Sequence, residues 1–150
     1  MVRVPEGASE AVIKRISHLG FAVRDLDQAI ELYEGVFGAR VEHRFESAQD
    51  RMRAATLRVG EVEIELMQPL EPDSPVGKYI AKRGEGIHHV AFKVDDVAGA
   101  LDRAQAEGLE TVDKEPRAGG DGRTRIGFLH PKSTGGVLME REEDVEPARH

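Results

Sequence analysis

The sequence predicts an α+β fold in which two tandem βαβββ modules form a curved mixed sheet, related by a pseudo-twofold axis, around a central cleft. Three observations lead to this prediction. The chain has 150 residues, a strand-then-helix segment occurs twice, and a later strand that ends in glutamate also occurs twice. We expect residues 1–150 to form a single domain, with module one at about 14–70, a connector at 71–86 and module two at about 87–141.

The repeat is clearest around two histidines. Residues 17–26 read SHLGFAVRDL and residues 88–97 read HHVAFKVDDV, which places His18 opposite His89 and aligns the following Phe, Val and Asp. Apolar residues then recur at helical spacing in both segments, in module one at Leu26, Ile30, Tyr33 and Phe37. Later, VEIE at 62–65 matches VLME at 137–140, and the extra residues of module two are expected in the glycine-rich stretch 117–125.

Each module is therefore expected to run strand, helix and then three strands. We expect helices within 25–39 and 96–110, each ending at a glycine, and a short helix at the centre of the connector. A chance similarity of two strand–helix units is the alternative, but three elements that match in order favour an internal repeat. The expected strands are 16–23, 40–46, 52–59 and 61–68 in module one, and 87–94, 109–113, 124–129 and 136–141 in module two.

Alternation along these strands places one histidine and one glutamate of each module on the face opposite the apolar residues. They occupy repeat-related positions, His18 and Glu65 in module one and His89 and Glu140 in module two. A single histidine or glutamate on a strand is usually structural or solvated. The duplicated pair instead favours one shared site, in which two imidazoles and two carboxylates suit a divalent metal ion with open positions. The interpretation requires that no β-bulge turns one of these side chains to the other face.

The composition excludes several kinds of protein. Without cysteine, the chain has no disulfide, no thiol nucleophile and no thiolate metal site. A net charge of -7 argues against non-specific nucleic-acid binding, which needs a basic face. The sequence contains no apolar run long enough for a transmembrane helix and no apolar core of a signal peptide at its start. We therefore expect a cytoplasmic protein with no nucleic-acid or membrane partner.

Segments around the four candidate ligands resemble the vicinal oxygen chelate superfamily, which includes glyoxalase I, extradiol dioxygenases and bleomycin-resistance proteins. Within it, the chain is most similar to the methylmalonyl-CoA epimerase family, from about Ile16 to Glu140. The βαβββ pattern alone would not indicate an activity, because one fold hosts many. The most specific segments are ISHLGFAV at 16–23, ELMQPL at 65–70, RGEGIHHVAF at 83–92 and HPKSTGGVLME at 130–140.

This resemblance implies an isomerase that interconverts the R and S forms of methylmalonyl-CoA at C2 through an enolate. It implies one divalent metal ion, with cobalt or manganese favoured and zinc, nickel or magnesium possible, and a homodimer. It makes His18, Glu65, His89 and Glu140 the metal ligands, and we expect Glu140 to be an acid/base group as well. Some members carry a second catalytic glutamate in the third strand of module one, where this chain has Ala54, so the second group is left open between Glu65 and water.

The acyl-CoA substrate that the resemblance implies carries phosphates, so an acidic protein needs a local basic patch to bind it. Lys132 and Arg125 are the candidate substrate residues, close in sequence to two further arginines. The alternative function is that of a glyoxalase I-like lactoylglutathione lyase or another metalloenzyme of the same fold. An extradiol dioxygenase would use two histidines and one carboxylate, so Glu65 as a fourth ligand counts against it. A binding module without catalysis would need no metal ligands.

Overall fold

Residues 12–145 are described by this computed structural model, and they contain eight strands and three α-helices. The strands form one mixed sheet in the order β2-β3-β4-β1-β5-β8-β7-β6. The chain divides into two compact units, Ser17–Val90 and a second unit that, within the described residues, comprises 12–16 and 91–145. The predicted α+β class and the repeated strand–helix–strand modules are confirmed.

The unit Ser17–Val90 holds module one and the start of module two. Strands β2, β3 and β4 pair antiparallel, and β4 pairs parallel with β1. Its elements in chain order are β1 (Arg15–Ala22), α1 (Leu26–Glu31), the π-helical turn η2 (Leu32–Val36), β2 (Val41–Ser47), β3 (Met52–Val59), β4 (Val62–Pro69), α2 (Pro75–Arg83) and β5 (Gly86–Lys93).

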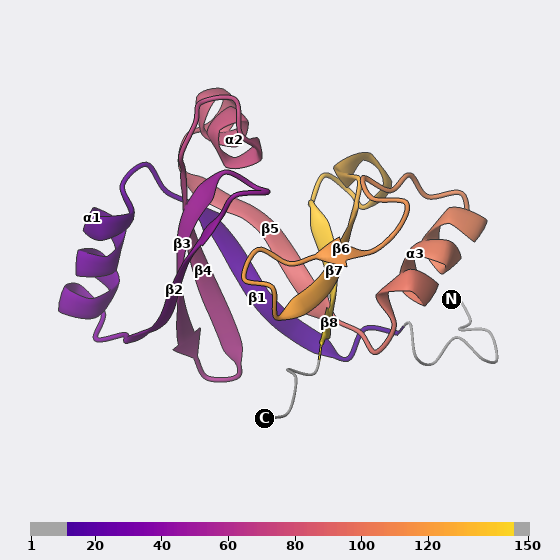
Figure 1. Cartoon of the computed structure of the whole chain (residues 1–150), viewed down its shortest axis with the longest axis horizontal. Helices are drawn as coiled ribbons and strands as arrows, with labels where there is room; N and C mark the ends of the chain where they lie inside the picture. The colour runs from indigo at the N-terminus through magenta and orange to yellow at the C-terminus, as the bar shows by residue number, and fades with distance from the viewer. Residues whose placement is uncertain (1–11, 146–150) are drawn as a thin grey trace. The chain divides into compact units, whose positions relative to one another are not determined.

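Helix α1 covers one face of strands β1, β3 and β4 (Figure 1). Asp25 caps its N-terminus by accepting a hydrogen bond from the Gln28 backbone N–H at 3.1 Å. Leu26 and Ile30 are buried against Ala55, Leu57 and Leu66 on the sheet. Because strand residues alternate, His18, Gly20, Thr56 and Glu65 lie on the opposite face, which α2 covers at one end through Val76, Tyr79 and Ile80.

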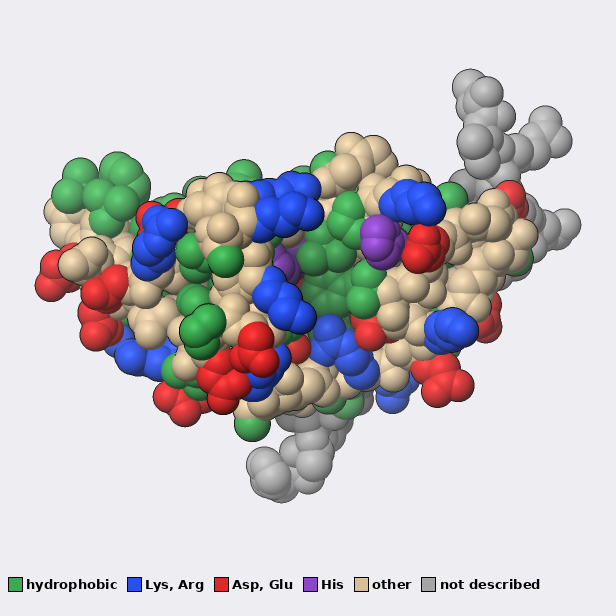
Figure 2. Space-filling model, turned by 90° about the horizontal axis from the view of Figure 1, so that it is seen from above, with side chains coloured by type: hydrophobic (Ala, Val, Ile, Leu, Met, Phe, Trp, Pro, Cys, Tyr) green, Lys and Arg blue, Asp and Glu red, His purple; other side chains and the backbone are tan. Residues whose placement is uncertain are grey.

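The helical stripe predicted through Phe37 is not continuous. The helix widens into a π turn after Glu31, so that Val36 and Phe37 are 72% and 61% exposed. Phe37 contacts only the edge of the Tyr33 ring among the described aromatic side chains, with centroids 5.4 Å apart. Hydrophobic side chains accordingly gather on the surface at the end of the molecule where α1 lies (Figure 2).

The second unit repeats the packing of a helix on a sheet. Asp96 caps α3 through the Gly99 backbone N–H, and the buried side of the helix packs on Val94 and Leu129 beside β7 and β8 (Figure 1). Strands β6, β7 and β8 pair antiparallel. Its elements are α3 (Val97–Ala106), β6 (Arg117–Ala118), β7 (Thr124–Leu129), the 3-10 turn η3 (Pro131–Ser133) and β8 (Met139–Asp144).

The strand expected at 109–113 was wrong, because Thr111 makes only an isolated bridge to Leu129 there. The Asp113 carboxylate accepts the Phe128 backbone N–H at 2.9 Å and the Arg117 Nε–H at 3.0 Å. The Asp113 side chain therefore accepts the hydrogen bond of a β7 backbone N–H that a neighbouring strand would otherwise accept. The strand that pairs with β7 on this side is the short β6 instead.

The last strand begins later than predicted. Gly135 and Gly136 have φ of 70° and 91°, a left-handed conformation that no strand contains, so β8 starts at Met139 rather than near 136. It continues to Asp144, which leaves Glu140 near its start. Across residues 12–145, no helix has the length and apolar character that crossing a membrane requires.

Candidate metal centre

Two histidines from neighbouring strands meet on the face of the sheet that α1 leaves free. His18 lies on β1 and His89 on β5, and their side chains are buried, with residue exposures of 7% and 4%. Their Nε2 atoms are 2.9 Å apart, and the rings meet edge to face at 87°. The structure thus brings together the two histidines that the sequence repeat predicts as ligands.

The separation of these two nitrogens fits coordination of one ion. With metal–nitrogen bonds of about 2.1 Å, two imidazoles are roughly 3.0 Å apart at a 90° angle and roughly 3.4 Å apart at a tetrahedral angle. The observed 2.9 Å is a hydrogen-bond distance between the two rings, and it also matches the right angle. Adjacent octahedral positions have this geometry, and an octahedral ion bound by few protein ligands keeps sites for water or substrate.

Glu140 is the predicted carboxylate ligand of module two. It lies on β8 opposite Phe128, belongs to the second unit and is 4% exposed. A buried carboxylate needs a cation or hydrogen bonds to offset its desolvation. His18, His89 and Glu140 are all buried, and imidazole and carboxylate are donor types that suit a divalent metal ion.

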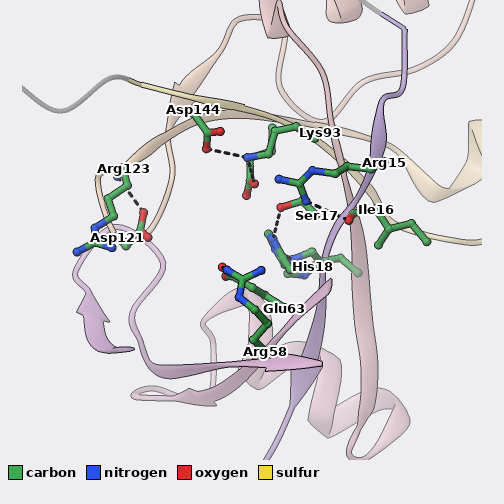
Figure 3. A network of polar contacts seen from close by, with 12 residues as sticks. Arg15, Ile16, Ser17, His18, Arg58, Glu63, Lys93, Asp121, Arg123 and Asp144 are labelled. Atoms are coloured by element: carbon green, nitrogen blue, oxygen red, sulfur yellow. Dashed lines mark hydrogen bonds and ion pairs between the residues drawn. The ribbon is translucent and has the colours of Figure 1, made fainter. Parts of the chain in front are cut away.

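The predicted fourth ligand, Glu65, lies outside this group of three. It pairs with Gly20 in the parallel register of β4 and β1, which places it on the same face of the sheet as His18. On the same face, Arg58 forms an ion pair with Glu63, the register partner of His18, at 2.8 Å (Figure 3). After Glu63, Glu65 is therefore the next residue of β4 whose side chain lies on the same face of the sheet as His18.

The residue that precedes each histidine approaches its other ring nitrogen. Ser17 Oγ lies 3.5 Å from His18 Nδ1, at the outer limit of a hydrogen bond, and His88 Nδ1 lies 3.0 Å from His89 Nδ1 (Figure 3 labels the first pair). Contacts of this kind select the tautomer of a metal-binding histidine and hold its ring. Both leave Nε2 as the nitrogen that faces the other ring.

His88 is held in a neutral form beside His89. Burial lowers the pKa of His88 to about 4, against a smaller opposing effect of the Asp50 charge. The His88 ring meets the Tyr79 ring of α2 edge to face, with centroids 5.1 Å apart. Sequence reasoning assigned no functional role to His88, and the His-His pair in the second module was the available signal.

Ala54, at the place where some relatives in the resembled family carry a glutamate, belongs to the hydrophobic core. It is 1% exposed and packs with Met67 and Val76. A methyl group holds no proton, so this position contributes packing alone. The second acid/base group of the predicted reaction has to come from elsewhere.

The two predicted substrate residues lie in different places. Lys132 is exposed on η3, and its backbone N–H donates to His130 Nδ1 at 3.0 Å, so that His130 caps this turn. Arg125 pairs with Glu143 in the register of β7 and β8, at 3.8 Å between charged groups. By strand alternation, Arg125 is on the opposite face of β7 and β8 from Glu140.

A partly buried ion cluster, which sequence reasoning missed, follows Glu140 along the same face of β8. Lys93 Nζ lies 2.6 Å from a Glu142 carboxylate oxygen and 2.8 Å from one of Asp144 (Figure 3). The side chains of Lys93 and Glu142 are only 12% and 8% exposed. Burial lowers the pKa of Lys93 and the two carboxylates raise it, with the net result above its ordinary value, so that the lysine stays charged.

Comparisons with known proteins match most of this chain. Residues 17–128 match the family model of the glyoxalase/bleomycin resistance protein/dioxygenase superfamily. The uncharacterized protein YqjC of Bacillus subtilis (strain 168) is 34% identical over 128 residues, which are 85% of this chain and 91% of YqjC. The mitochondrial methylmalonyl-CoA epimerase of Dictyostelium discoideum is 33% identical over 132 residues, 87% of this chain and 79% of that protein.

A solved structure of a methylmalonyl-CoA epimerase in complex with methylmalonyl-CoA and NH4+ superimposes with a TM-score of 0.85. It is 37% identical, and the match covers 89% of this chain and 96% of that chain. The similarity therefore extends over most of this chain and nearly all of that one.

Proposed function

Because the chain belongs to the glyoxalase/bleomycin resistance protein/dioxygenase superfamily, we propose that it is a metal-dependent isomerase that epimerises methylmalonyl-CoA at C2. The observation that carries this proposal is the 2.9 Å separation of the His18 and His89 Nε2 atoms, which suits two adjacent positions on one ion. The similarity to epimerases named for this substrate supports the choice of acyl-CoA.

We propose His18, His89 and Glu140 as ligands of one divalent ion, with Glu65 as a fourth. Cobalt or manganese is the proposed metal, since imidazole and carboxylate donors suit both. When bound, the ion supplies positive charge that stabilises the negative charge that builds up on the thioester as its α-proton leaves. Four protein ligands would leave two positions of an octahedral ion open.

In this proposal Glu140 also exchanges a proton with one face of C2, and a second proton carrier serves the opposite face. Removing the acidified α-proton and returning one to the opposite face interconverts the R and S forms. Glu65, the repeat-related carboxylate on the histidine face of β4, or a water molecule is the second proton carrier, because Ala54 cannot be. Lys132, exposed on η3, is the proposed contact to the phosphates of CoA, and the proposed assembly is a homodimer.

The test is exchange of the C2 proton of methylmalonyl-CoA with deuterated solvent, followed by mass spectrometry. Protein loaded with Co²⁺ or Mn²⁺ is expected to incorporate one deuterium, and a chelator is expected to abolish incorporation until the metal is restored. Turnover of a glutathione hemithioacetal without any exchange into methylmalonyl-CoA would replace the proposal with the lactoylglutathione lyase alternative. Exchange that a chelator leaves unchanged would contradict the metal site.

A further inference from the structure

Gly20 on β1 lies directly beneath the imidazole of His89. A Cβ atom built on Gly20 would lie 2.2 Å from His89 Cε1, 2.5 Å from Nδ1 and 2.8 Å from Nε2. Real Cβ atoms essentially never approach other heavy atoms below 3.0 Å. The ring of His89 therefore occupies the space that any side chain larger than hydrogen would need at position 20.

Neither the backbone nor the internal repeat explains a glycine at this position. Gly20 is not among the residues with positive φ, so its conformation is open to any residue. Glycine also weakens a strand interior, where other residues pack better. The repeat-related residue of module two is Ala91. The close approach of the His89 ring therefore explains the glycine at position 20.

We propose that Gly20 is a positioning residue for His89. Because glycine has no side chain, the imidazole of His89 can lie against β1 at this position. The role of that histidine as a ligand rests on the proposed function. In the strand order, β1 stands between β4 and β5. A ring that lies over Gly20 is therefore directed away from its own strand and toward His18 Nε2 on β1.

The atoms with which a Cβ at position 20 would clash predict the effect of an alanine there. The atoms that a Gly20 Cβ would meet belong to one ring, which can turn about its side-chain torsions. At Gly77, by contrast, a Cβ would meet the backbone oxygens of Glu71 and Pro72 at 2.5 and 2.6 Å. Gly20→Ala can therefore keep the fold by turning His89 aside, and this movement takes Nε2 away from His18.

The first test is metal affinity. Titration of Gly20→Ala with Co²⁺, followed by calorimetry, is expected to give an affinity lower by about tenfold or more, as for other losses of ligand positioning. Gly35→Ala is the matched control, since no atom lies within 4 Å of a Cβ there and its φ is not positive. Wild-type affinity in Gly20→Ala would overturn the proposal.

A second test does not depend on the metal and separates this inference from the proposed function. In apoprotein, Gly20→Ala is expected to lower the midpoint of thermal unfolding in the wild-type background. In a His89→Ala background, where the ring is absent, the same substitution is expected to leave the midpoint unchanged or raise it, because alanine restricts the unfolded chain. An equal loss in both backgrounds would show that Gly20 acts on something other than His89. The predicted pattern in a protein that binds no metal would retain this inference and reject the proposed function.

Discussion

The Nδ1 atoms of His88 and His89 lie 3.0 Å apart, although the two residues are neighbours along β5. Because burial lowers the pKa of His88 to about 4, His88 is neutral at pH 7, and one Nδ1 donates its proton to the other. When His89 is the donor, its Nε2 carries a lone pair that can face a metal ion. The tautomer of His89 that a ligand needs is therefore the one in which His88 Nδ1 accepts this hydrogen bond.

The substitution His88→Phe tests this relationship. Phenylalanine retains an aromatic ring against Tyr79 but offers His89 no hydrogen-bond partner, so Co²⁺ affinity is expected to fall by about tenfold. Tyr79→Phe is the control, since it keeps the ring contact and removes only the hydroxyl that donates to the Ile87 carbonyl at 2.7 Å. Calorimetric titration of both variants measures the effect, and equal affinities would contradict an orienting role for His88.

Glu140→Gln removes the carboxylate charge with almost no change in shape. If Glu140 moves the α-proton, deuterium exchange into methylmalonyl-CoA is expected to fall by about 100-fold or more. Glu61→Gln, an exposed glutamate at the turn before β4, is expected to retain the wild-type rate. Mass spectrometry gives the rate, and a metal titration of the same protein reports on Glu140 as a ligand. Full exchange in Glu140→Gln would remove it from the proton transfer.

Lys93 offsets the buried charge of Glu142, with 2.6 Å between the charged atoms. Lys93→Met leaves that carboxylate without its cation and is expected to lower the free energy of unfolding by about 3 kcal/mol. Lys14→Met breaks an ion pair with Asp95 whose side chains are 46% and 59% exposed, and a loss below about 1 kcal/mol is expected there. Urea unfolding at pH 7 compares the two, and equal losses would mean that burial adds nothing to the Lys93 pair.

The same pair predicts a pH dependence of stability. The pKa of Lys93 is raised above its ordinary value of about 10.5. A group whose pKa is higher in the folded state stabilises fully below its unfolded pKa, and the contribution is lost as the pH rises through the folded value. The contribution of Lys93 is therefore expected to be complete at pH 9 and to decline above about pH 10.5. The difference in unfolding midpoint between wild type and Lys93→Met should shrink across that range, and a difference that grows there would have the wrong sign.

The face that carries the candidate ligands could be predicted from sequence because it depends on a period of two. His18 alternates with apolar residues that α1 buries, and the repeat extends the same reasoning to His89. What alternation cannot supply is which residue of one strand lies beside which residue of the next. The contact of the His89 ring with Gly20 and the approach of Lys93 to Glu142 both depend on strand pairing and on side-chain length.

The hydrophobic pattern of the sequence also did not predict local polar contacts. The stretch 109–113 has the composition of a strand, yet Asp113 accepts the Phe128 backbone N–H and so occupies a donor that strand pairing would use. A hydrophobic pattern reports burial and contains no information on which backbone donor a given carboxylate will reach. The late start of β8 has a different cause, because two adjacent glycines took a left-handed conformation that strand propensities do not represent.

Asp113→Ala tests whether the Asp113 carboxylate determines the course of the chain before β7. The substitution leaves the Phe128 N–H without its 2.9 Å acceptor and Arg117 Nε without its 3.0 Å partner. Loss of a hydrogen bond to a charged acceptor costs about 1.5–3 kcal/mol, so Asp113→Ala is expected to lower the free energy of unfolding by about 2 kcal/mol. Asp102→Ala, at an exposed position of α3, is expected to change it by less than about 0.5 kcal/mol. Hydrogen exchange adds a local measurement, since the Phe128 amide should lose protection in Asp113→Ala while the amides of α3 keep theirs. Retained protection at Phe128 would mean that another group takes up this donor and that Asp113 does not determine the course of the chain before β7.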